Sequence, residues 1–118
     1  MRILVVDDDI DLRSALIEVL RLSGYQVEGA NSGNEAIAVL KSGSSFDLVL
    51  SDHLMRNGNG LDILTHIQTM STPRPIFFLM TGHSEVRGEE AKRMGVAEFI
   101  LKPFDVVELL AAIKRFCT

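Results

Sequence analysis

Residues 3–9 read ILVVDDD, four consecutive apolar residues followed directly by three aspartates. Consecutive apolar residues are typical of a strand covered on both faces, as in a parallel sheet, because such a strand has no side facing solvent. The runs LVL at 48–50 and IFFLM at 76–80 have the same character. Apolar runs predict strands at residues 3–6, 25–30, 46–50, 76–80 and 97–101.

Segments with helical spacing of apolar residues lie between and after these strands. They predict helices around residues 12–20, 36–40, 61–67, 85–94 and 106–116. Gly24 and Gly43 end the first two helices. Ser32 and Glu35 form a capping-box pattern before the second helix, and Asp105 is placed to cap the last.

Strands that alternate with helices predict a doubly wound (βα)5 fold of the α/β class. Right-handed crossovers then give a five-stranded parallel sheet with helices on both faces, which makes three layers. In open sheets of this kind the functional site lies at the carboxyl ends of the strands. We therefore expect the residues that directly follow each apolar run to converge in space.

The residues at these positions carry charge and hydrogen-bonding groups. They are Asp7, Asp8 and Asp9 after the first run, Asp52 after the third, Thr81 after the fourth and Lys102 after the fifth. Carboxylates in one crevice repel each other, which raises their pKa values unless a cation is present. Hard oxygen ligands suit Mg²⁺, which binds one or two carboxylates together with phosphate oxygens and waters.

Each of these residues alone has an ordinary structural interpretation. Adjacent aspartates before a helix are commonly N-caps, and Thr81 followed by Gly82 is typical of a turn. Their joint placement after four different strands instead favours a site for phosphoryl transfer. That reaction depends on positioning and charge neutralisation more than on acid–base chemistry.

Length and composition limit the other classes of function. A chain of 118 residues, 47% of them hydrophobic, predicts one domain over residues 1–118. The formal charge of −4 argues against nucleic acid as a direct ligand. Cys117 is the only cysteine, which excludes an internal disulfide, and no apolar run approaches the ~20 residues that cross a bilayer. We expect a cytoplasmic protein that does not bind membranes.

Four strings in this order resemble the receiver domain of response regulators in two-component signalling, of which the single-domain chemotaxis regulator is the simplest member. They are ILVVDDD at 3–9, LVLSD at 48–52 with Met55 and Gly60 after it, FLMTGH at 78–83, and FILKPF at 99–104. The resemblance covers essentially the whole chain. It implies a flavodoxin-like fold with strand order 2-1-3-4-5 and a cis peptide bond between Lys102 and Pro103.

The resemblance also implies a role for each matching residue. Asp52 would be the phosphoacceptor, Lys102 would pair with it and then with the phosphoryl group, Thr81 would turn toward the phosphate, and Phe99 would move inward as the switch aromatic. The expected ligands of Mg²⁺, for which Mn²⁺ would substitute, are Asp8, Asp52, the backbone carbonyl of Leu54 and, through water, Asp7.

Some residues depart from the family pattern or lie at its edge. Arg56 stands where a proline is usual, and the following Asn-Gly-Asn-Gly suggests a mobile loop. Leu54 and His83, two residues after Asp52 and Thr81, are expected to tune the lifetime of the phosphorylated state, and Arg56 to modulate the site. The spacing of His53, His66 and His83 fits no metal site, so we expect them at the surface or the rim.

The partners implied by the resemblance are a sensor histidine kinase or a histidine phosphotransfer protein as donor, with acetyl phosphate as a small alternative. The output would reach a downstream protein or output domain through the surface of the fourth helix, the fifth strand and the fifth helix, and phosphorylation-dependent homodimers are a further expectation. Enzymatic activity beyond self-directed phosphotransfer and autodephosphorylation is not expected.

Two other functions compete with this interpretation. A small haloacid-dehalogenase-like phosphatase would use the Asp-x-Asp spacing of Asp7 and Asp9, with Lys102 as a later partner. Asp11 occupies a position where such enzymes have a small or β-branched residue, and no second acidic motif follows the fourth strand. A flavodoxin-like nucleotide binder would need a phosphate-cradling loop where the three aspartates stand.

Overall fold

Strands and helices alternate over residues 1–82 as expected, and a further strand and helix follow within residues 92–117. The computed structural model describes residues 1–82 and 92–117. Its elements are β1 (Arg2–Val6), α1 (Ile10–Leu22), β2 (Gln26–Ala30), α2 (Gly33–Lys41), β3 (Leu48–Asp52), α3 (Gly60–Gln68), β4 (Ile76–Thr81), β5 (Glu98–Leu101) and α5 (Val106–Cys117). Most of the expected fourth helix, together with His83, lies outside the described residues, although residues 92–93 are helical.

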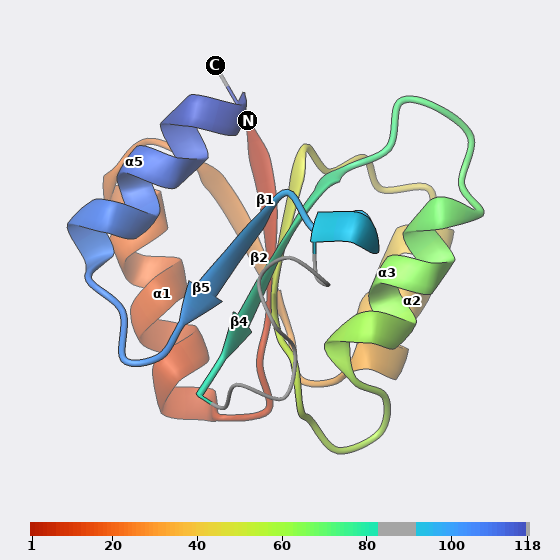
Figure 1. Ribbon diagram of the computed structural model, residues 1–118, viewed down its shortest axis with the longest axis horizontal. Coiled ribbons are helices and arrows are strands. Elements are labelled where there is room, and N and C mark those ends of the chain that lie inside the picture. The colour runs from red at the N-terminus through yellow and green to blue at the C-terminus, as the bar shows by residue number, and fades with distance from the viewer. Residues whose placement is uncertain (83–91, 118) are drawn as a thin grey trace.

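The five strands form one parallel sheet in the order β2-β1-β3-β4-β5, which confirms the predicted topology. Helices α1 and α5 cover one face, and α2 and α3 cover the other (Figure 1). The predicted three-layer, doubly wound arrangement is therefore confirmed. In the part of the chain that the structure describes, no helix is long and apolar enough to span a bilayer.

The core consists of two apolar layers, one on each side of the sheet. Phe77 and Phe78 are adjacent in β4 and both are buried, Phe77 among the residues of α2 and α3 and Phe78 among those of α1 and α5. Successive side chains of a strand point to opposite faces, so a strand between two helical layers needs apolar residues at every position. This explains why IFFLM shows no alternation of apolar and polar residues.

The helix starts agree with most of the predicted caps. The Asp9 carboxylate accepts hydrogen bonds from the backbone N–H groups of Asp11 and Leu12, which caps α1. The Asp105 carboxylate accepts one from the backbone N–H of Val107, as predicted for the start of α5.

The capping box predicted for α2 is only half correct. Ser32 accepts from the backbone N–H of Glu35, but the Glu35 carboxylate accepts from the N–H of Asn31 instead of that of Ser32. The chain turns into the helix at Ser32 in an extended conformation, which brings the preceding N–H within reach of Glu35. A complete capping box occurs at α3, between Asn59 and Asp62.

The position of the third strand differs most from its prediction. Strand β3 runs from Leu48 to Asp52, two residues later than the predicted 46–50, because its parallel pairing with β4 continues through two polar residues, Ser51 and Asp52. Asp52 is therefore the last residue of the strand. The peptide bond between Lys102 and Pro103 is cis, as the resemblance implied.

Candidate functional site

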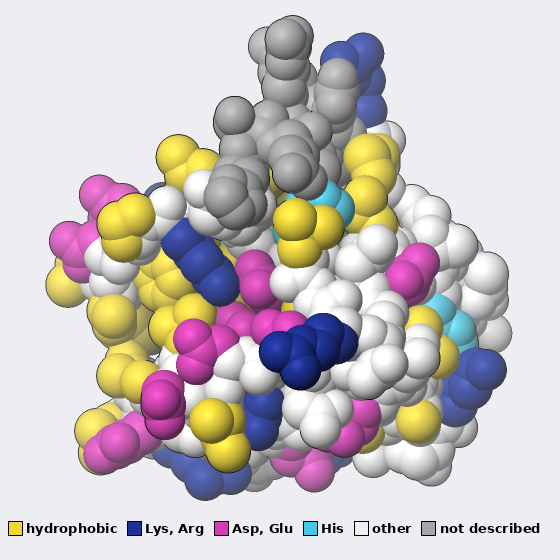
Figure 2. All heavy atoms as spheres, turned by 90° about the horizontal axis from the view of Figure 1, so that it is seen from below, with side chains coloured by type: hydrophobic (Ala, Val, Ile, Leu, Met, Phe, Trp, Pro, Cys, Tyr) yellow, Lys and Arg dark blue, Asp and Glu magenta, His cyan; other side chains and the backbone are white. Residues whose placement is uncertain are grey.

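Three of the predicted carboxylates meet at the carboxyl edge of the sheet. The register pairs Val6 of β1 with Ser51 of β3, so the next residues, Asp7 and Asp52, lie beside each other. One carboxylate oxygen from each of Asp7, Asp8 and Asp52 lies within 4.8 Å of the others. Figure 2 views this edge and shows acidic side chains gathered in a hollow between basic ones. The site therefore lies where the topology placed it.

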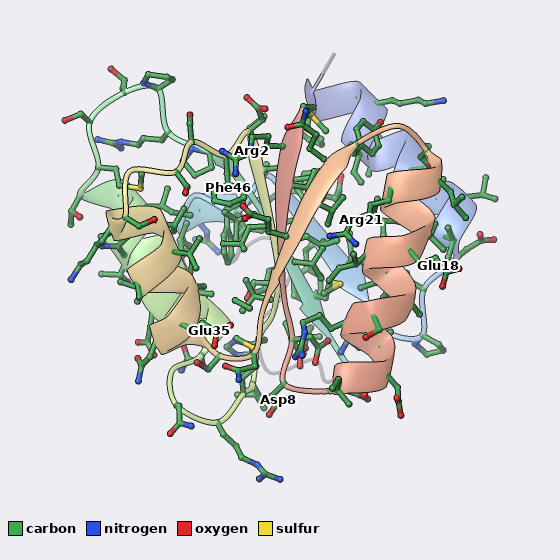
Figure 3. The ribbon with its side chains drawn as sticks, turned by 180° about the vertical axis from the view of Figure 1, so that it is seen from behind. Arg2, Asp8, Glu18, Arg21, Glu35 and Phe46 are labelled. Atoms are coloured by element: carbon green, nitrogen blue, oxygen red, sulfur yellow. The ribbon has the colours of Figure 1, made fainter. Side chains whose placement is uncertain are left out.

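The three carboxylates differ in how accessible they are. Asp7 is fully buried, Asp52 is partly buried and Asp8 is exposed. Figure 3 shows Asp8 at the same end of the sheet as Glu35, which lies in the first turn of α2, and Arg2 and Phe46 at the opposite end. The cluster thus opens to solvent on the side of Asp8.

Lys102 brings a positive charge to the cluster from the end of β5. Its Nζ lies 3.2 Å from Oδ1 of Asp52 and 3.3 Å from Oδ2 of Asp7. Its backbone N–H donates to the carbonyl oxygen of Thr81 at 2.7 Å, which fixes the lysine to the end of β4. Residues from three strands therefore form one ionic group.

The shifted pKa values of Asp52 and Lys102 reflect the burial of this group and its excess of negative charge. Burial raises the pKa of Asp52, the nearby Asp7 adds to the rise, and Lys102 opposes it. Burial alone would lower the pKa of Lys102, but the carboxylates of Asp52 and Asp7 outweigh it, so this pKa is raised and the lysine stays charged. One lysine does not neutralise three carboxylates. The donor set and its charge fit a hard divalent cation such as Mg²⁺.

The two predicted switch residues lie on neighbouring strands, β4 and β5. Thr81 ends β4 and is 2% exposed. Phe99 of β5 is paired with Leu79 of β4 and packs against the apolar layer of α2 and α3. Alternation along β4 places Thr81 on the same side of the sheet as Leu79. Thr81 and Phe99 are thus on one face, on neighbouring strands.

The loop between β3 and α3 borders the cluster and is held by backbone contacts. The N–H of Gly33 donates to the carbonyl of Gly58, and the N–H of Gly60 donates to that of His53. A Cβ atom on Gly60 would lie 2.5 Å from the carbonyl oxygen of Asp52, and one on Gly33 would lie 2.6 Å from Gly58. These glycines therefore permit close packing of backbone. The mobility of this loop that the sequence suggested stays a prediction.

Two of the residues predicted to modulate the site flank it. Leu54 is 48% exposed, and the backbone N–H of Arg56 donates to Oδ2 of Asp8 at 3.2 Å. His66 lies on α3 and is partly exposed, as expected. The predicted surface position of His53 is wrong, because alternation from Asp52 turns this side chain inward and leaves it 6% exposed.

Sequence reasoning missed other neighbours of the cluster. Nη1 of Arg13 donates to the carbonyl oxygen of Asp7 at 2.7 Å. Asn31 lines a cavity of about 430 Å³ together with Asp8, Asp9, Arg56 and Asn57. The signal for Asn31 was its position directly after β2, whose carboxyl end lies next to that of β1.

The arrangement also separates the competing functions. Asp9 caps α1 and is not one of the three clustered carboxylates, although the phosphatase interpretation requires it. The loop after β1 carries carboxylates where a nucleotide binder would cradle phosphate, so a bare anion would be repelled there.

Comparison with known proteins agrees with this arrangement. The model of the family described as response regulator receiver domain matches residues 3–114. The chain is 38% identical over 114 residues to the transcriptional regulatory protein CpxR of Klebsiella pneumoniae, covering 96% of this chain and 47% of CpxR. It is 37% identical over 114 residues to the transcriptional regulatory protein ZraR of Escherichia coli, covering 96% of this chain and 25% of ZraR. The chain thus spans about half or a quarter of the length of these relatives.

Solved structures show the same fold. The response regulator protein TrrA of Thermotoga maritima, in complex with Mg²⁺-BeF, is 31% identical with a TM-score of 0.85, covering 98% of this chain and 97% of TrrA. The non-phosphorylated HemR receiver domain of Leptospira biflexa is 35% identical with a TM-score of 0.84, covering 98% of this chain and 92% of that domain. These matches give no support to the phosphatase interpretation. The chain therefore belongs to the response regulator receiver domain family of two-component signalling proteins.

Proposed function

We propose that this domain accepts a phosphoryl group on Asp52 and signals by the change in shape that follows. The observation that carries the proposal is the Asp52 carboxylate itself, which is partly accessible and 3.2 Å from Nζ of Lys102. Asp7 is fully buried and accepts from the N–H of Asp9 and from Lys102, so a donor cannot reach it. Asp8 is exposed but has no ion pair with the lysine.

In the proposed reaction an oxygen of Asp52 attacks the phosphorus of the donor. The new bond joins this oxygen to phosphorus, the bond between phosphorus and the leaving group breaks, and the leaving group takes the electron pair. From acetyl phosphate the leaving group is acetate, which needs no proton. Lys102 stays charged and holds a phosphoryl oxygen, and the hydroxyl of Thr81 turns toward another.

The residues that would hold Mg²⁺ are Asp8, Asp52 and the backbone carbonyl of Leu54, with Asp7 acting through water. Bound there, Mg²⁺ would supply the positive charge that one lysine cannot provide for three carboxylates and an incoming phosphoryl group. Mn²⁺, which takes similar oxygen ligands, would substitute for it.

The proposed switch uses Thr81 and Phe99. Thr81 leaves its buried position to meet the phosphoryl group, and Phe99 moves inward to fill the space that Thr81 vacates. The rearrangement changes the surface of the expected fourth helix, β5 and α5, and so shifts the population of states that a partner binds. Leu54 and Arg56, at the rim of the site, and His83, outside the described residues, would tune how fast the phosphoryl group arrives and leaves.

The proposed donor is a phosphohistidine on a sensor kinase or a phosphotransfer protein in the cytoplasm. The matched relatives are transcriptional regulators much longer than this chain, which supports an output domain or a separate downstream protein as the receiver of the signal. The third proposed partner is a second copy of this chain, in a homodimer formed on phosphorylation.

Intact mass spectrometry after incubation with acetyl phosphate and Mg²⁺ tests the proposal. The wild-type protein should gain the mass of one phosphoryl group, and Asp52→Asn should gain none. Asp11→Asn is the matched control, because Asp11 lies on α1 outside the cluster and should leave the gain intact. An unlabelled wild type, or equal labelling of Asp52→Asn, would overturn the proposal.

A further inference from the structure

Arg56 lies at the edge of the acidic site, where backbone hydrogen bonds of the loop between β3 and α3 hold it. Its N–H donates to Oδ2 of Asp8, one of the three clustered carboxylates. The neighbouring Asn57 carbonyl accepts from the N–H of Asn34 at the start of α2, which anchors the loop on its other side. The position of Arg56 relative to the cluster is therefore set by hydrogen bonds on both sides of the residue.

The guanidinium group of Arg56 has no partner among the described residues. Within residues 1–82 and 92–117 it makes no hydrogen bond or ion pair, although Asp8 and Asp9 line the same cavity of about 430 Å³. Arg13 and Arg21, by contrast, each donate to a backbone carbonyl. Arg56 thus brings an exposed positive charge to a polar cavity that Asp8, a member of the carboxylate cluster with Asp52, also lines.

The charges of the site explain what such a cation would do. Asp7, Asp8 and Asp52 carry three negative charges, against one on Lys102 and two on a bound divalent cation, so the loaded site is close to neutral. A phosphoryl donor brings about one and a half to two further negative charges near neutral pH. Lys102 is only partly exposed and already contacts two carboxylates, so it has little capacity to attract a donor from solution.

We propose that Arg56 is a specificity-determining residue that recruits anionic phosphoryl donors, acting opposite Lys102 at the outer side of the site. The inference rests on the proposed phosphorylation of Asp52. The guanidinium binds oxygens of the donor's phosphoryl group while the Asp52 oxygen attacks phosphorus and the leaving group departs with its electron pair. A planar guanidinium suits this role because it can bind two phosphate oxygens at once.

A purely structural role for Arg56 makes a different prediction. If Arg56 only held the loop in place, its replacement would disturb Asp8 and weaken both Mg²⁺ binding and phosphorylation. If the charge of Arg56 recruits donors, neutralising it removes two effects at once: the repulsion between this charge and Mg²⁺, and the attraction between this charge and the donor. Mg²⁺ should then bind more tightly while phosphorylation becomes slower, and the opposite signs separate the two roles.

The experiment compares wild type with Arg56→Gln, Arg56→Lys and Arg74→Gln. Arg74 is the control for the charge change, because it lies next to Asp47 and Pro73 at the opposite end of the sheet. The rate of phosphorylation by acetyl phosphate is followed by intact mass at low and high salt, with phosphoramidate as a less negative donor. Mg²⁺ affinity is measured by calorimetry on the same proteins.

Arg56→Gln should slow phosphorylation by acetyl phosphate by roughly two- to five-fold at low salt, the size expected for an exposed charge pair, and the difference should shrink as salt screens it. The effect should be smaller with phosphoramidate. Mg²⁺ should bind slightly more tightly to Arg56→Gln than to wild type. Arg56→Lys should give a rate between those of Arg56→Gln and wild type, because lysine keeps the charge but cannot bind two phosphate oxygens in the planar geometry of a guanidinium. Arg74→Gln should match wild type.

Equal rates for Arg56→Gln and wild type, or a joint loss of Mg²⁺ affinity and rate, would overturn the role of Arg56. Asp52 would still be labelled in that case. A wild type that is not labelled at all would instead refute the proposed phosphorylation, so the two failures are distinguishable.

Discussion

Replacing Asp52 by asparagine should make the metal-free protein more stable, although it removes the proposed reactive group. At an effective dielectric constant of about 20, carboxylate oxygens within 4.8 Å repel each other by at least about 3.5 kcal/mol per pair, and Asp52 faces both Asp7 and Asp8. Its attraction to Lys102 at 3.2 Å is about 5 kcal/mol on the same scale. These charge pairs alone make the charge on Asp52 cost the folded state about 2 kcal/mol without metal, and burial, the main cause of its raised pKa, adds to this cost.

Asparagine keeps the size of the side chain and removes this charge. In EDTA at neutral pH we expect Asp52→Asn to raise the free energy of unfolding by about 2 kcal/mol, or the melting temperature by about 5–10 °C. Mg²⁺ at about a hundred times its dissociation constant should stabilise wild type by about 3 kcal/mol, and the variant by less because it lacks one ligand. The difference in stability between Asp52→Asn and wild type should therefore shrink or change sign when Mg²⁺ is added.

The stability difference between Asp52→Asn and wild type should also depend on pH. The pKa of Asp52 is raised above its ordinary value of 3.8, so the folded protein binds this proton more readily than the unfolded chain does. The stability gained by protonating Asp52 is present below 3.8 and is lost as the pH rises through the raised pKa. The advantage of Asp52→Asn should therefore be small in acid and full at neutral pH.

Urea unfolding followed by far-ultraviolet circular dichroism suits the measurement, because the chain has no tryptophan. A variant that is less stable than wild type in EDTA at neutral pH would contradict the electrostatic account of the site. So would Mg²⁺ that stabilises both proteins equally, because Asp52 would then not be a ligand.

The remaining predictions concern the surroundings of Asp52. Asp9→Ala should lose about 1 kcal/mol of stability in urea unfolding, because α1 loses its cap, yet it should be phosphorylated like wild type; loss of labelling would favour the phosphatase interpretation. Gly60→Ala should lower stability by about 1–3 kcal/mol or more, because its Cβ would meet the carbonyl of Asp52, and an unchanged melting curve would show that the loop can move aside. Lys102→Met should bind Mg²⁺ more tightly in calorimetry but be phosphorylated about 10²–10³-fold more slowly, and an unaltered rate would remove the lysine from the reaction.

Much of the fold was predictable because the periodicity of apolar residues reports burial directly. The runs ILVV and IFFLM have no polar face, which only a strand between two helical layers requires. Parallel topology then brings strand ends together, so the meeting of Asp7, Asp52 and Lys102 followed from their positions after the strands.

Other features depend on contacts that no spacing reveals. Strand β3 continues into Ser51 and Asp52 because β1 and β4 offer hydrogen-bonding partners there. The polar side chains of these two residues do not themselves indicate a strand. His53 is buried for the same reason, since the alternation continues one residue beyond Asp52, the last residue of β3. The reach of Arg13 back to the carbonyl of Asp7 depends on how α1 lies on the sheet.

The most direct test of the account is to locate the phosphoryl group chemically. After incubation with acetyl phosphate and Mg²⁺, borohydride reduction converts an aspartyl phosphate to homoserine, which peptide mass spectrometry places in the chain. The account predicts homoserine at position 52 alone, with none in EDTA and a strongly reduced yield in Lys102→Met. Homoserine at position 7, 8 or 9, or labelling that does not require Mg²⁺, would contradict it.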